Sequence, residues 1–163
     1  MHGSCAELSH ATMLKIGDKM PRFEVVDHEG NAVSSSDLMN NGCKTIIYFY
    51  PKDNTPGCTT EACSLRDGYA ALTAAGYNVV GVSKDSARSH AGFRAKHGLP
   101  FMLLSDPTTQ VMQDFGAWGE KKMCGKTSVG TLRRTFIFST EGILERIIEK
   151  VDTKNAAAQI LEG

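Results

Sequence analysis

The stretch from Thr45 to Cys63 constrains the fold of this chain more than any other part of it. It begins with a β-branched and aromatic run that ends at Tyr50, and such a run is typical of a buried strand. Pro51 ends that strand, and a turn-forming segment follows. A helical pattern then opens close to Cys58. The chain therefore passes from a buried strand into a helix, and a cysteine stands where the helix begins.

A cysteine in the first turn of a helix has a distinct chemistry. The positive end of the helix dipole and the unpaired amide N–H groups both favour the thiolate over the thiol. The thiolate is the reactive form of the side chain, so the sequence predicts that Cys58 is a nucleophile. Many free cysteines simply pack as small apolar groups, and the position of Cys58 alone leaves that interpretation open.

A second cysteine, Cys63, follows five residues after Cys58. Along one continuous helix this spacing gives about 7.5 Å of rise and about 140° of rotation, so the two Cα atoms would lie roughly 8–9 Å apart. A disulfide tolerates a Cα separation of at most about 7 Å, so a bond between these cysteines requires the helix to open. A zinc site is disfavoured because C-x4-C is not a common zinc spacing and the five histidines are scattered.

These residues carry a resemblance to a known family. Pro51-x3-Thr55-x2-Cys58 matches the P-x-x-x-T-x-x-C active-site motif of peroxiredoxins. The longer string YFYPKDNTPGCTTEAC resembles the bacterioferritin comigratory protein (peroxiredoxin Q) branch of that family. The likeness covers about residues 14–162 and continues at Ser64-Leu65-Arg66-Asp67, Leu103-Leu104-Ser105-Asp106, Trp118-Gly119-Glu120-Lys121 and Arg133-Arg134-Thr135-Phe136.

Strand and helix patterns alternate along the chain, beginning with a β-hairpin that turns at His28-Glu29-Gly30-Asn31. This alternation fits an α/β fold with a central mixed β-sheet flanked by helices, and the resemblance implies the thioredoxin fold. Gly116–Gly130 is interpreted as a long loop. Strands are expected at 23–27, 32–34, 45–50, 77–82, 101–104, 135–138 and 143–148, and helices at 37–39, 58–75, 86–95, 108–115 and 155–161.

The composition narrows the class of protein. A chain of 163 residues suits one domain, expected at 14–163, and residues 1–13 are expected to be a poorly ordered N-terminal extension without the features of a secretory signal. Equal numbers of basic and acidic residues, 18 of each, argue against a nucleic-acid partner. No run approaches the ~20 apolar residues of a membrane span. Five cysteines leave at least one thiol free, so we expect a reducing compartment, the cytoplasm.

The resemblance implies a thiol peroxidase that needs neither a cofactor nor a metal. Such an enzyme requires an activated sulfur and donors directed at the charge that develops on the peroxide oxygens. Cys58 would be the peroxidatic nucleophile. Thr55 would present its hydroxyl to the sulfur and the peroxide, and the N–H groups of Gly57 and Cys58 would be further donors. Pro51 and Pro56 would stiffen the loop and shield the thiolate.

The resemblance also implies a cation beside the sulfur. The family's R-x-T-F segment corresponds to Arg133, before Thr135-Phe136, and Arg134 is the competing candidate. Strand alternation sends adjacent side chains to opposite faces, so one of the two arginines is expected at the site. Glu61 matches the family's acid that orients the arginine, although an acid near a helix start is also favourable in itself. Arg66 and Asp67 are expected to form a surface pair and nothing more.

In this family's scheme Cys63 would be the resolving cysteine, which attacks the Cys58 sulfenic acid and forms an intramolecular Cys58–Cys63 disulfide. Thioredoxin or a similar dithiol reductant would recycle that disulfide. Cys5, Cys43 and Cys124 match no motif position. The expected enzyme reduces hydrogen peroxide and organic hydroperoxides to water or alcohols, and is a monomer or a weak homodimer.

Two other functions could use the same cysteines. A thiol–disulfide oxidoreductase would suit a thioredoxin-like scaffold, but that class typically carries C-x-x-C, which the chain lacks. A redox sensor or holdase could form the same disulfide without turnover. Consumption of peroxide separates the three, because a sensor reacts stoichiometrically and an oxidoreductase leaves peroxide untouched.

Overall fold

The computed structural model describes residues 14–39 and 42–163, so the extension predicted at residues 1–13 and Cys5 within it lie outside the described residues. The strands are β1 (Glu24–Asp27), β2 (Ala32–Ser34), β3 (Lys44–Phe49), β4 (Tyr77–Ser83), β5 (Met102–Ser105), β6 (Trp118–Met123), β7 (Lys126–Thr131), β8 (Arg134–Phe138) and β9 (Leu144–Ile148). The helices are α2 (Ser35–Met39), α3 (Pro56–Asp67), α4 (Tyr69–Ala74), α5 (Ala87–His97), α6 (Gln110–Phe115), η1 (Thr153–Asn155) and α7 (Ala156–Glu162).

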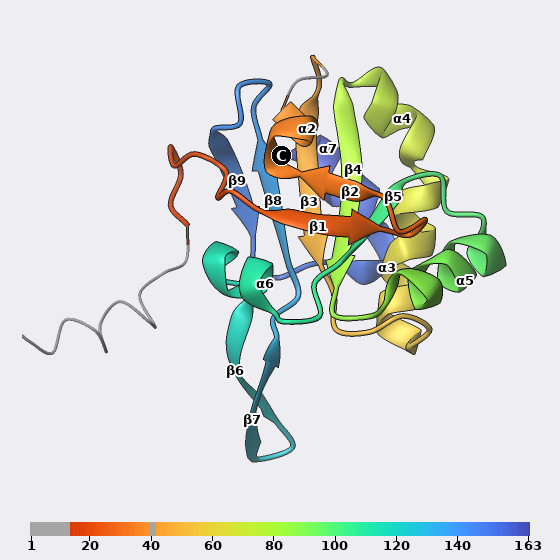
Figure 1. The fold of residues 1–163 in the computed structure, drawn as a ribbon, viewed down its shortest axis with the longest axis vertical. Coiled ribbons are helices and arrows are strands. Elements are labelled where there is room, and N and C mark those ends of the chain that lie inside the picture. Colours follow the sequence, from red (N-terminus) through yellow and green to blue (C-terminus); the bar gives the residue numbers. More distant parts are fainter. Residues whose placement is uncertain (1–13, 40–41) are drawn as a thin grey trace, which may run out of the picture.

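The described residues form a seven-stranded mixed sheet in the order β2-β1-β5-β4-β3-β8-β9, with helices on both faces (Figure 1). Strands β3, β4 and β5 run parallel, and β8 and β9 continue the sheet antiparallel beyond β3. At the other edge β1 and β2 form an antiparallel hairpin. The mixed α/β architecture and the N-terminal hairpin predicted from the sequence are confirmed.

Strand β3 lies inside the sheet, between β4 and β8. Ile46, Tyr48 and Tyr50 enter a core covered by α3, α4, α5 and α7, whereas Ile47 and Phe49 enter a second core beneath α2 and α6. All five side chains are at most 1% exposed. A strand covered on both faces has no polar side, and this burial explains the continuous apolar run that precedes the turn.

The single helix predicted over Cys58–Ala75 is wrong in two respects. It begins earlier, because Pro56 occupies the first helical position, where its missing N–H costs nothing. It is also interrupted at Gly68 (φ −97°, ψ 8°), which separates α3 from α4. Helix α7 approaches so closely there that a Cβ on Gly68 would lie 2.3 Å from the Cβ of Ala157. The break therefore lets α7 pack against α3 and α4.

The long loop predicted at Gly116–Gly130 is also wrong, since β6 and β7 pair there as an antiparallel hairpin that projects from the body of the molecule (Figure 1). Its turn is Cys124-Gly125, with left-handed φ values of 52° and 78°. This conformation suits a two-residue hairpin turn. Most of the described side chains between Glu120 and Val129 are exposed, so no buried face imposed an apolar alternation on the sequence.

Other helix ends follow the predicted capping. The Ser86 hydroxyl accepts a hydrogen bond from the Ser89 N–H at 3.1 Å, and Gly98 ends α5 with a φ of 59°. Helix α6 begins at Gln110, two residues after the predicted start at Thr108. Among the described helices, none has the length and apolar character needed to cross a bilayer.

Candidate active site

The loop between β3 and α3 lies where two neighbouring parallel strands end. Strand β3 leads into this loop, and β4, its parallel neighbour, leads toward Asp85. The carboxyl ends of parallel strands meet at the same edge of a sheet, which is a common location for functional sites. The Asp53 N–H donates to Asp85 Oδ2 at 2.8 Å, so the end of β4 holds the loop directly.

A buried pair of side chains, Asp53 and His90, anchors the same loop to α5. The Asp53 carboxylate lies 2.8 Å from His90 Nδ1 and also accepts hydrogen bonds from the Tyr50 and Ser89 hydroxyls at 2.6 and 2.8 Å. His90 Nε2 lies 2.9 Å from the Leu104 carbonyl oxygen. Because a carbonyl and a carboxylate only accept, both ring nitrogens of His90 face acceptors. Burial alone would raise the pKa of Asp53, but the bonds from His90 and Tyr50 outweigh it and hold that pKa below its usual value.

Sequence reasoning missed this network. Within the described residues, one group of side chains could hold a metal ion, namely Asp53, Asp85 and His90. Their potential ligand atoms all lie within 4.8 Å of one another. These atoms form hydrogen bonds with protein donors and acceptors. The group is therefore explained without a metal, because its hydrogen bonds hold the loop in place. The feature of the sequence that could have drawn attention to Asp53 is its position between Pro51 and Thr55 in the motif. No feature of the sequence connects it to His90, which was interpreted as a scattered histidine.

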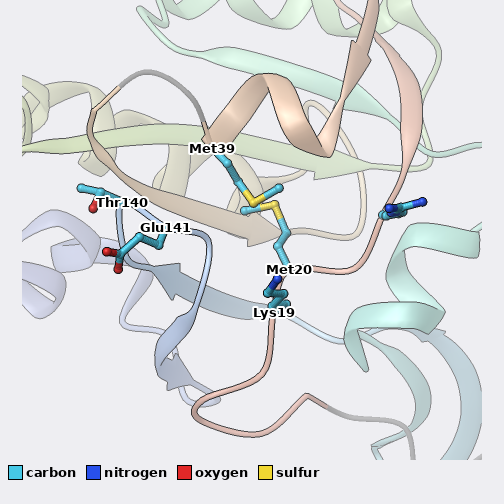
Figure 2. A pocket seen from close by; sticks show the side chains of 6 residues that line it. Lys19, Met20, Met39, Thr140 and Glu141 are labelled. Carbon is cyan, nitrogen blue, oxygen red and sulfur yellow. The ribbon is translucent and has the colours of Figure 1, made fainter.

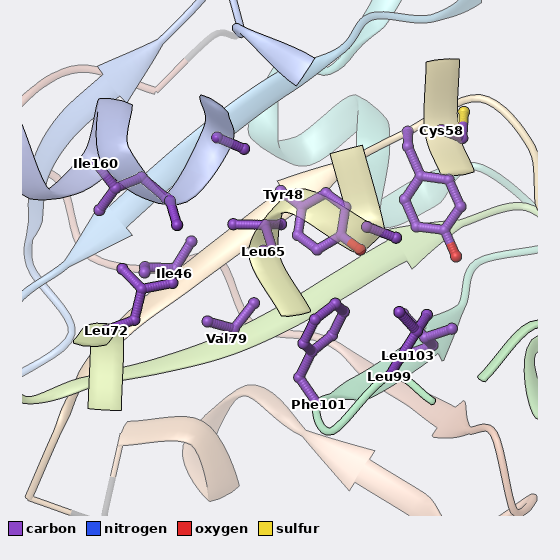
Figure 3. Packing of buried hydrophobic residues seen from close by; sticks show 14 of the residues in the cluster. Ile46, Tyr48, Cys58, Leu65, Leu72, Val79, Leu99, Phe101, Leu103 and Ile160 are labelled. Carbon is purple, nitrogen blue, oxygen red and sulfur yellow. The ribbon is translucent and has the colours of Figure 1, made fainter. Parts of the chain in front are cut away.

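Cys58 is the third residue of α3 and is 1% exposed. Figure 3 shows it at the edge of the core cluster that also contains Tyr48 and Leu65. The first backbone hydrogen bond of the helix runs from the Thr59 N–H to the Thr55 carbonyl oxygen at 2.8 Å. The N–H groups of Gly57 and Cys58 thus have no partner among the described residues, and they remain available to negative charge at the helix start.

Arg133 reaches this helix start from the segment that joins β7 to β8. Its Nη2 donates to the Cys58 sulfur at 3.4 Å, and its Nη1 donates to Glu61 Oε1 at 2.7 Å. Gly57 leaves room for this approach, because a Cβ there would lie 3.2 Å from Nη2, a tight contact. Burial opposes the charge on Arg133, but Glu61 and Cys58 outweigh it and place the guanidinium pKa above its usual value. Arg133 is therefore a cation in contact with the sulfur.

Arg134 points away from this cluster. Its Nη1 donates to the Gly116 carbonyl, and its Nη2 lies 3.4 Å from Glu149. The two adjacent arginines thus diverge, as strand alternation predicts. Of the two candidates from the sequence, Arg133 is the arginine whose contacts include Cys58.

Glu61 lies beneath Arg133 and is 1% exposed. Burial raises the pKa of Glu61 from its ordinary value of 4.5 to about 7, against the opposing effect of Arg133. Its Oε2 and the Tyr48 hydroxyl have no hydrogen-bond partner within the described part of the chain. A buried polar group without a partner costs about 1–3 kcal/mol. The folded arrangement around the sulfur is therefore locally expensive.

Thr55 is the residue that precedes α3, with extended backbone (φ −89°, ψ 154°). Its hydroxyl donates to the Lys52 carbonyl at 2.8 Å. That bond uses the single proton of the hydroxyl, so the oxygen can serve a bound molecule as an acceptor. Pro51 follows β3 and Pro56 opens α3, so the two prolines lie at the ends of the loop.

Cys63 lies on a different side of α3 from Cys58. Its side chain is partly exposed, and its sulfur is 3.9 Å from His97 Nδ1. It opens into a surface groove of about 380 Å³ that is also lined by Thr59, Thr60, Ser64, Asp67 and Lys154. Both thiols are free, which agrees with the separation expected on an intact helix. Cys43 is partly exposed and Cys124 is exposed.

A larger cavity, of about 560 Å³, contains none of the predicted site residues. The side chains of Met20 and Met39 point toward one another at its wall (Figure 2). Its lining contains neither a cysteine nor a histidine, and none of the buried ion pairs described above. The full lining is Lys19, Met20, Arg22, Met39, Thr140 and Glu141.

Comparison with known proteins gives consistent matches. The model of the AhpC/TSA family matches residues 16–147. Peroxiredoxin Bcp of Escherichia coli (strain K12) is 42% identical over 142 residues, which is 87% of this chain and 90% of that protein.

Solved structures match as well. The bacterioferritin comigratory protein of Xanthomonas campestris, studied for its alkyl peroxide reduction activity, superposes with a TM-score of 0.78 at 35% identity and covers 86% of this chain and 88% of its own. PrxQ of Xylella fastidiosa gives a TM-score of 0.82 at 29% identity, over 91% of this chain and 94% of that chain.

Proposed function

The chain belongs to the AhpC/TSA family and is a peroxiredoxin with the thioredoxin fold, and on this premise we propose that Cys58 reduces hydrogen peroxide and organic hydroperoxides. We infer that Cys63 resolves the oxidised sulfur as an intramolecular disulfide, which thioredoxin or a similar dithiol reductant recycles. The observation that carries the proposal is the contact of Arg133 with Cys58 at the start of α3. A helix N-terminus and a guanidinium both favour a thiolate.

In the first step the Cys58 thiolate attacks the hydroxyl oxygen of the peroxide. The S–O bond forms as the O–O bond breaks, which leaves a sulfenic acid on Cys58 and an alkoxide or hydroxide that takes a proton from water. Thr55 accepts a hydrogen bond from the peroxide hydroxyl, a role that its donation to Lys52 leaves open. Arg133 and the N–H groups at the helix start stabilise the negative charge that develops on the leaving oxygen.

In the second step Cys63 attacks the sulfenic sulfur. The two cysteines lie on one helix, so the beginning of α3 unwinds before the bond can form. The unwinding sacrifices a few helical hydrogen bonds, each worth about 0.5–1.5 kcal/mol net. It also releases the Glu61 carboxyl, on the same helix, from its burial beneath Arg133. This relief supports an exchange between a folded, peroxide-competent form and a locally unfolded, disulfide-bonded form.

The setting of the enzyme forms part of the proposal. We place it in the cytoplasm, because Cys58, Cys63 and Cys124 are free thiols, and free thiols suit a reducing compartment. Residues 14–163 act as one domain and as a monomer, with a weak homodimer as the alternative.

A reductase-coupled assay tests the proposal. Reduced protein is mixed with thioredoxin, thioredoxin reductase and NADPH, and hydrogen peroxide or an organic hydroperoxide starts the reaction. Multiple turnovers that depend on thioredoxin are expected with both substrates. A single stoichiometric oxidation with each reductant tried would indicate a sensor, and intact peroxide would indicate a thiol–disulfide oxidoreductase. Either result contradicts the proposed function.

A further inference from the structure

The sulfur of Cys63 has a specific neighbour. Nδ1 of His97 lies 3.9 Å from it, within reach of a weak S–H donor. His97 is the last residue of α5, so the contact joins α5 to the middle of α3. The ring of Phe93 meets the imidazole edge to face, with centroids 5.2 Å apart and planes at 76°, and so restricts its orientation. With its hydrogen on Nε2, His97 presents a proton acceptor to this thiol.

Arg66 supports the same contact. Its Nη1 donates to the His97 carbonyl oxygen at 2.8 Å, and its Nη2 pairs with Asp67 at 2.9 Å. The predicted surface pair of Arg66 and Asp67 is therefore confirmed, but Arg66 makes a further bond that the sequence did not predict. The guanidinium also interacts electrostatically with Cys63. Arg66 thus ties the end of α5 to α3 and places positive charge near the sulfur.

The half of α3 that carries Cys63 is anchored to the C-terminal helix. The Ser64 hydroxyl accepts a hydrogen bond from the Ala156 N–H at 2.8 Å, and Gly68 packs directly against Ala157. The half that carries Cys58 begins instead with N–H groups that have no partner among the described residues. If α3 opens at the Cys58 end, Cys63 keeps its anchored position and its contact with His97.

We propose that His97 is the base that deprotonates Cys63 for attack on the Cys58 sulfenic acid, an assignment that rests on the proposed function of Cys63. His97 Nδ1 takes the thiol proton, and the Cys63 sulfur attacks the Cys58 sulfur. The S–S bond forms as the S–O bond breaks, and the leaving hydroxide takes the proton from His97 and departs as water. The Cys63 sulfur is oxidised while the Cys58 sulfur is reduced, so no further oxidant is needed.

The charged groups around the groove and the pH together determine how much a base can speed the attack by Cys63. Arg66 and Lys154 bring positive charge to this groove, and the negative charge of Asp67 is paired with Arg66. A cysteine thiol with an ordinary pKa of about 8.5 is only about 3% ionised at pH 7, so full deprotonation could speed the attack by up to about thirtyfold. Well above about pH 8.5 an ordinary cysteine thiol is largely ionised without help, so a base should give less benefit there.

A single-turnover experiment tests the proposal. Reduced wild-type, His97→Ala and His97→Gln proteins receive one equivalent of hydrogen peroxide at several values of pH between about 6 and 9. Samples are quenched with an alkylating reagent, and mass spectrometry follows the Cys58 sulfenic acid and the Cys58–Cys63 peptide. Both variants should form the disulfide up to about thirtyfold more slowly at pH 7, with the deficit shrinking at high pH. Formation of the sulfenic acid should be unchanged.

The glutamine variant separates a base from a positioning group, because its amide can hold a hydrogen bond but cannot take the proton. Wild-type kinetics in His97→Gln would overturn the base assignment. Lys96→Ala, an exposed change one residue away, is the matched control and should match the wild type. If the wild-type protein forms no Cys58–Cys63 disulfide, the proposed function has failed. If it does, and His97→Ala is as fast at every pH, the inference about His97 alone is overturned.

Discussion

Arg133 donates a hydrogen bond to the sulfur of Cys58 across 3.4 Å, although the two residues are 75 positions apart in the chain. The other terminal nitrogen of the same guanidinium bonds to Glu61 at 2.7 Å. One cation therefore serves both the sulfur and a buried carboxyl. Because the pKa of that carboxyl is raised by burial to about 7, its charge changes near neutral pH. The site thus couples the ionisation of Glu61 to the positive charge available at the sulfur.

Replacement of Arg133 should slow the peroxide step. Arg133→Ala removes one preorganised donor, a change that typically costs about 10²–10³ in rate. Arg134→Ala is the matched control, since Arg134 bonds to the Gly116 carbonyl and to Glu149 instead. The measurement is the rate of Cys58 oxidation under single-turnover conditions. A larger loss in Arg134→Ala than in Arg133→Ala would contradict the assignment of this role to Arg133.

Cys58 should be indispensable for turnover. Cys58→Ser replaces the thiolate with a hydroxyl that is not ionised at neutral pH, so peroxidase activity should disappear in the reductase-coupled assay. Cys43→Ser and Cys124→Ser should keep rates within a few-fold of the wild type, because neither thiol lies in the cluster around Arg133. Activity that survives in Cys58→Ser would require another nucleophile.

Glu61 should make the reduced protein less stable as the pH rises. Its folded pKa, about 7, lies above its ordinary value of 4.5, so its stabilising effect is complete below about pH 4.5 and is lost as the pH rises through about 7. The loss is on the order of 3 kcal/mol at about 1.4 kcal/mol per pH unit. Urea unfolding across this range should show a smaller decline for Glu61→Gln than for the wild type. The exposed Glu120→Gln is the control, and equal declines in all three proteins would contradict the burial of Glu61.

The buried His90–Asp53 pair should contribute strongly to the free energy of unfolding. His90→Leu leaves the Asp53 carboxylate buried without its cation, and such a change typically costs about 3–5 kcal/mol. Since the pKa of Asp53 is lowered in the folded protein, this stabilisation is present above its ordinary pKa and is lost as the pH falls through the folded value. Urea unfolding at neutral pH measures the cost. The double variant His90→Leu/Asp53→Asn should recover part of it, and a single variant as stable as the wild type would refute the pair.

The sequence sufficed for the parts of the fold where local pattern and burial agree. The buried run before Pro51, the strand-to-helix turn and the cap at Ser86 each follow from residue type and spacing. The resemblance supplied Arg133 and Glu61, and the structure places both beside Cys58. Their roles in the reaction remain proposals that the variants above test.

The sequence failed where long-range packing or exposure decides the structure. The break at Gly68 is explained by Ala157, which is far along the chain, and the β6–β7 hairpin exposes most of its side chains and so has no apolar period. The Asp53–His90 pair and the contact of Cys63 with His97 each join segments more than 30 residues apart. No local pattern relates such residues, so only the fold reveals them.

The most direct test of the account is the covalent state of the protein after one equivalent of hydrogen peroxide. The intact mass should fall by two hydrogen atoms, and proteolysis should yield a peptide linking Cys58 to Cys63. Cys63→Ser should instead accumulate a sulfenic and then a sulfinic acid at Cys58. A wild-type disulfide from Cys58 to Cys124, or to a second chain, would show that Cys63 is a bystander and would contradict the opening of α3.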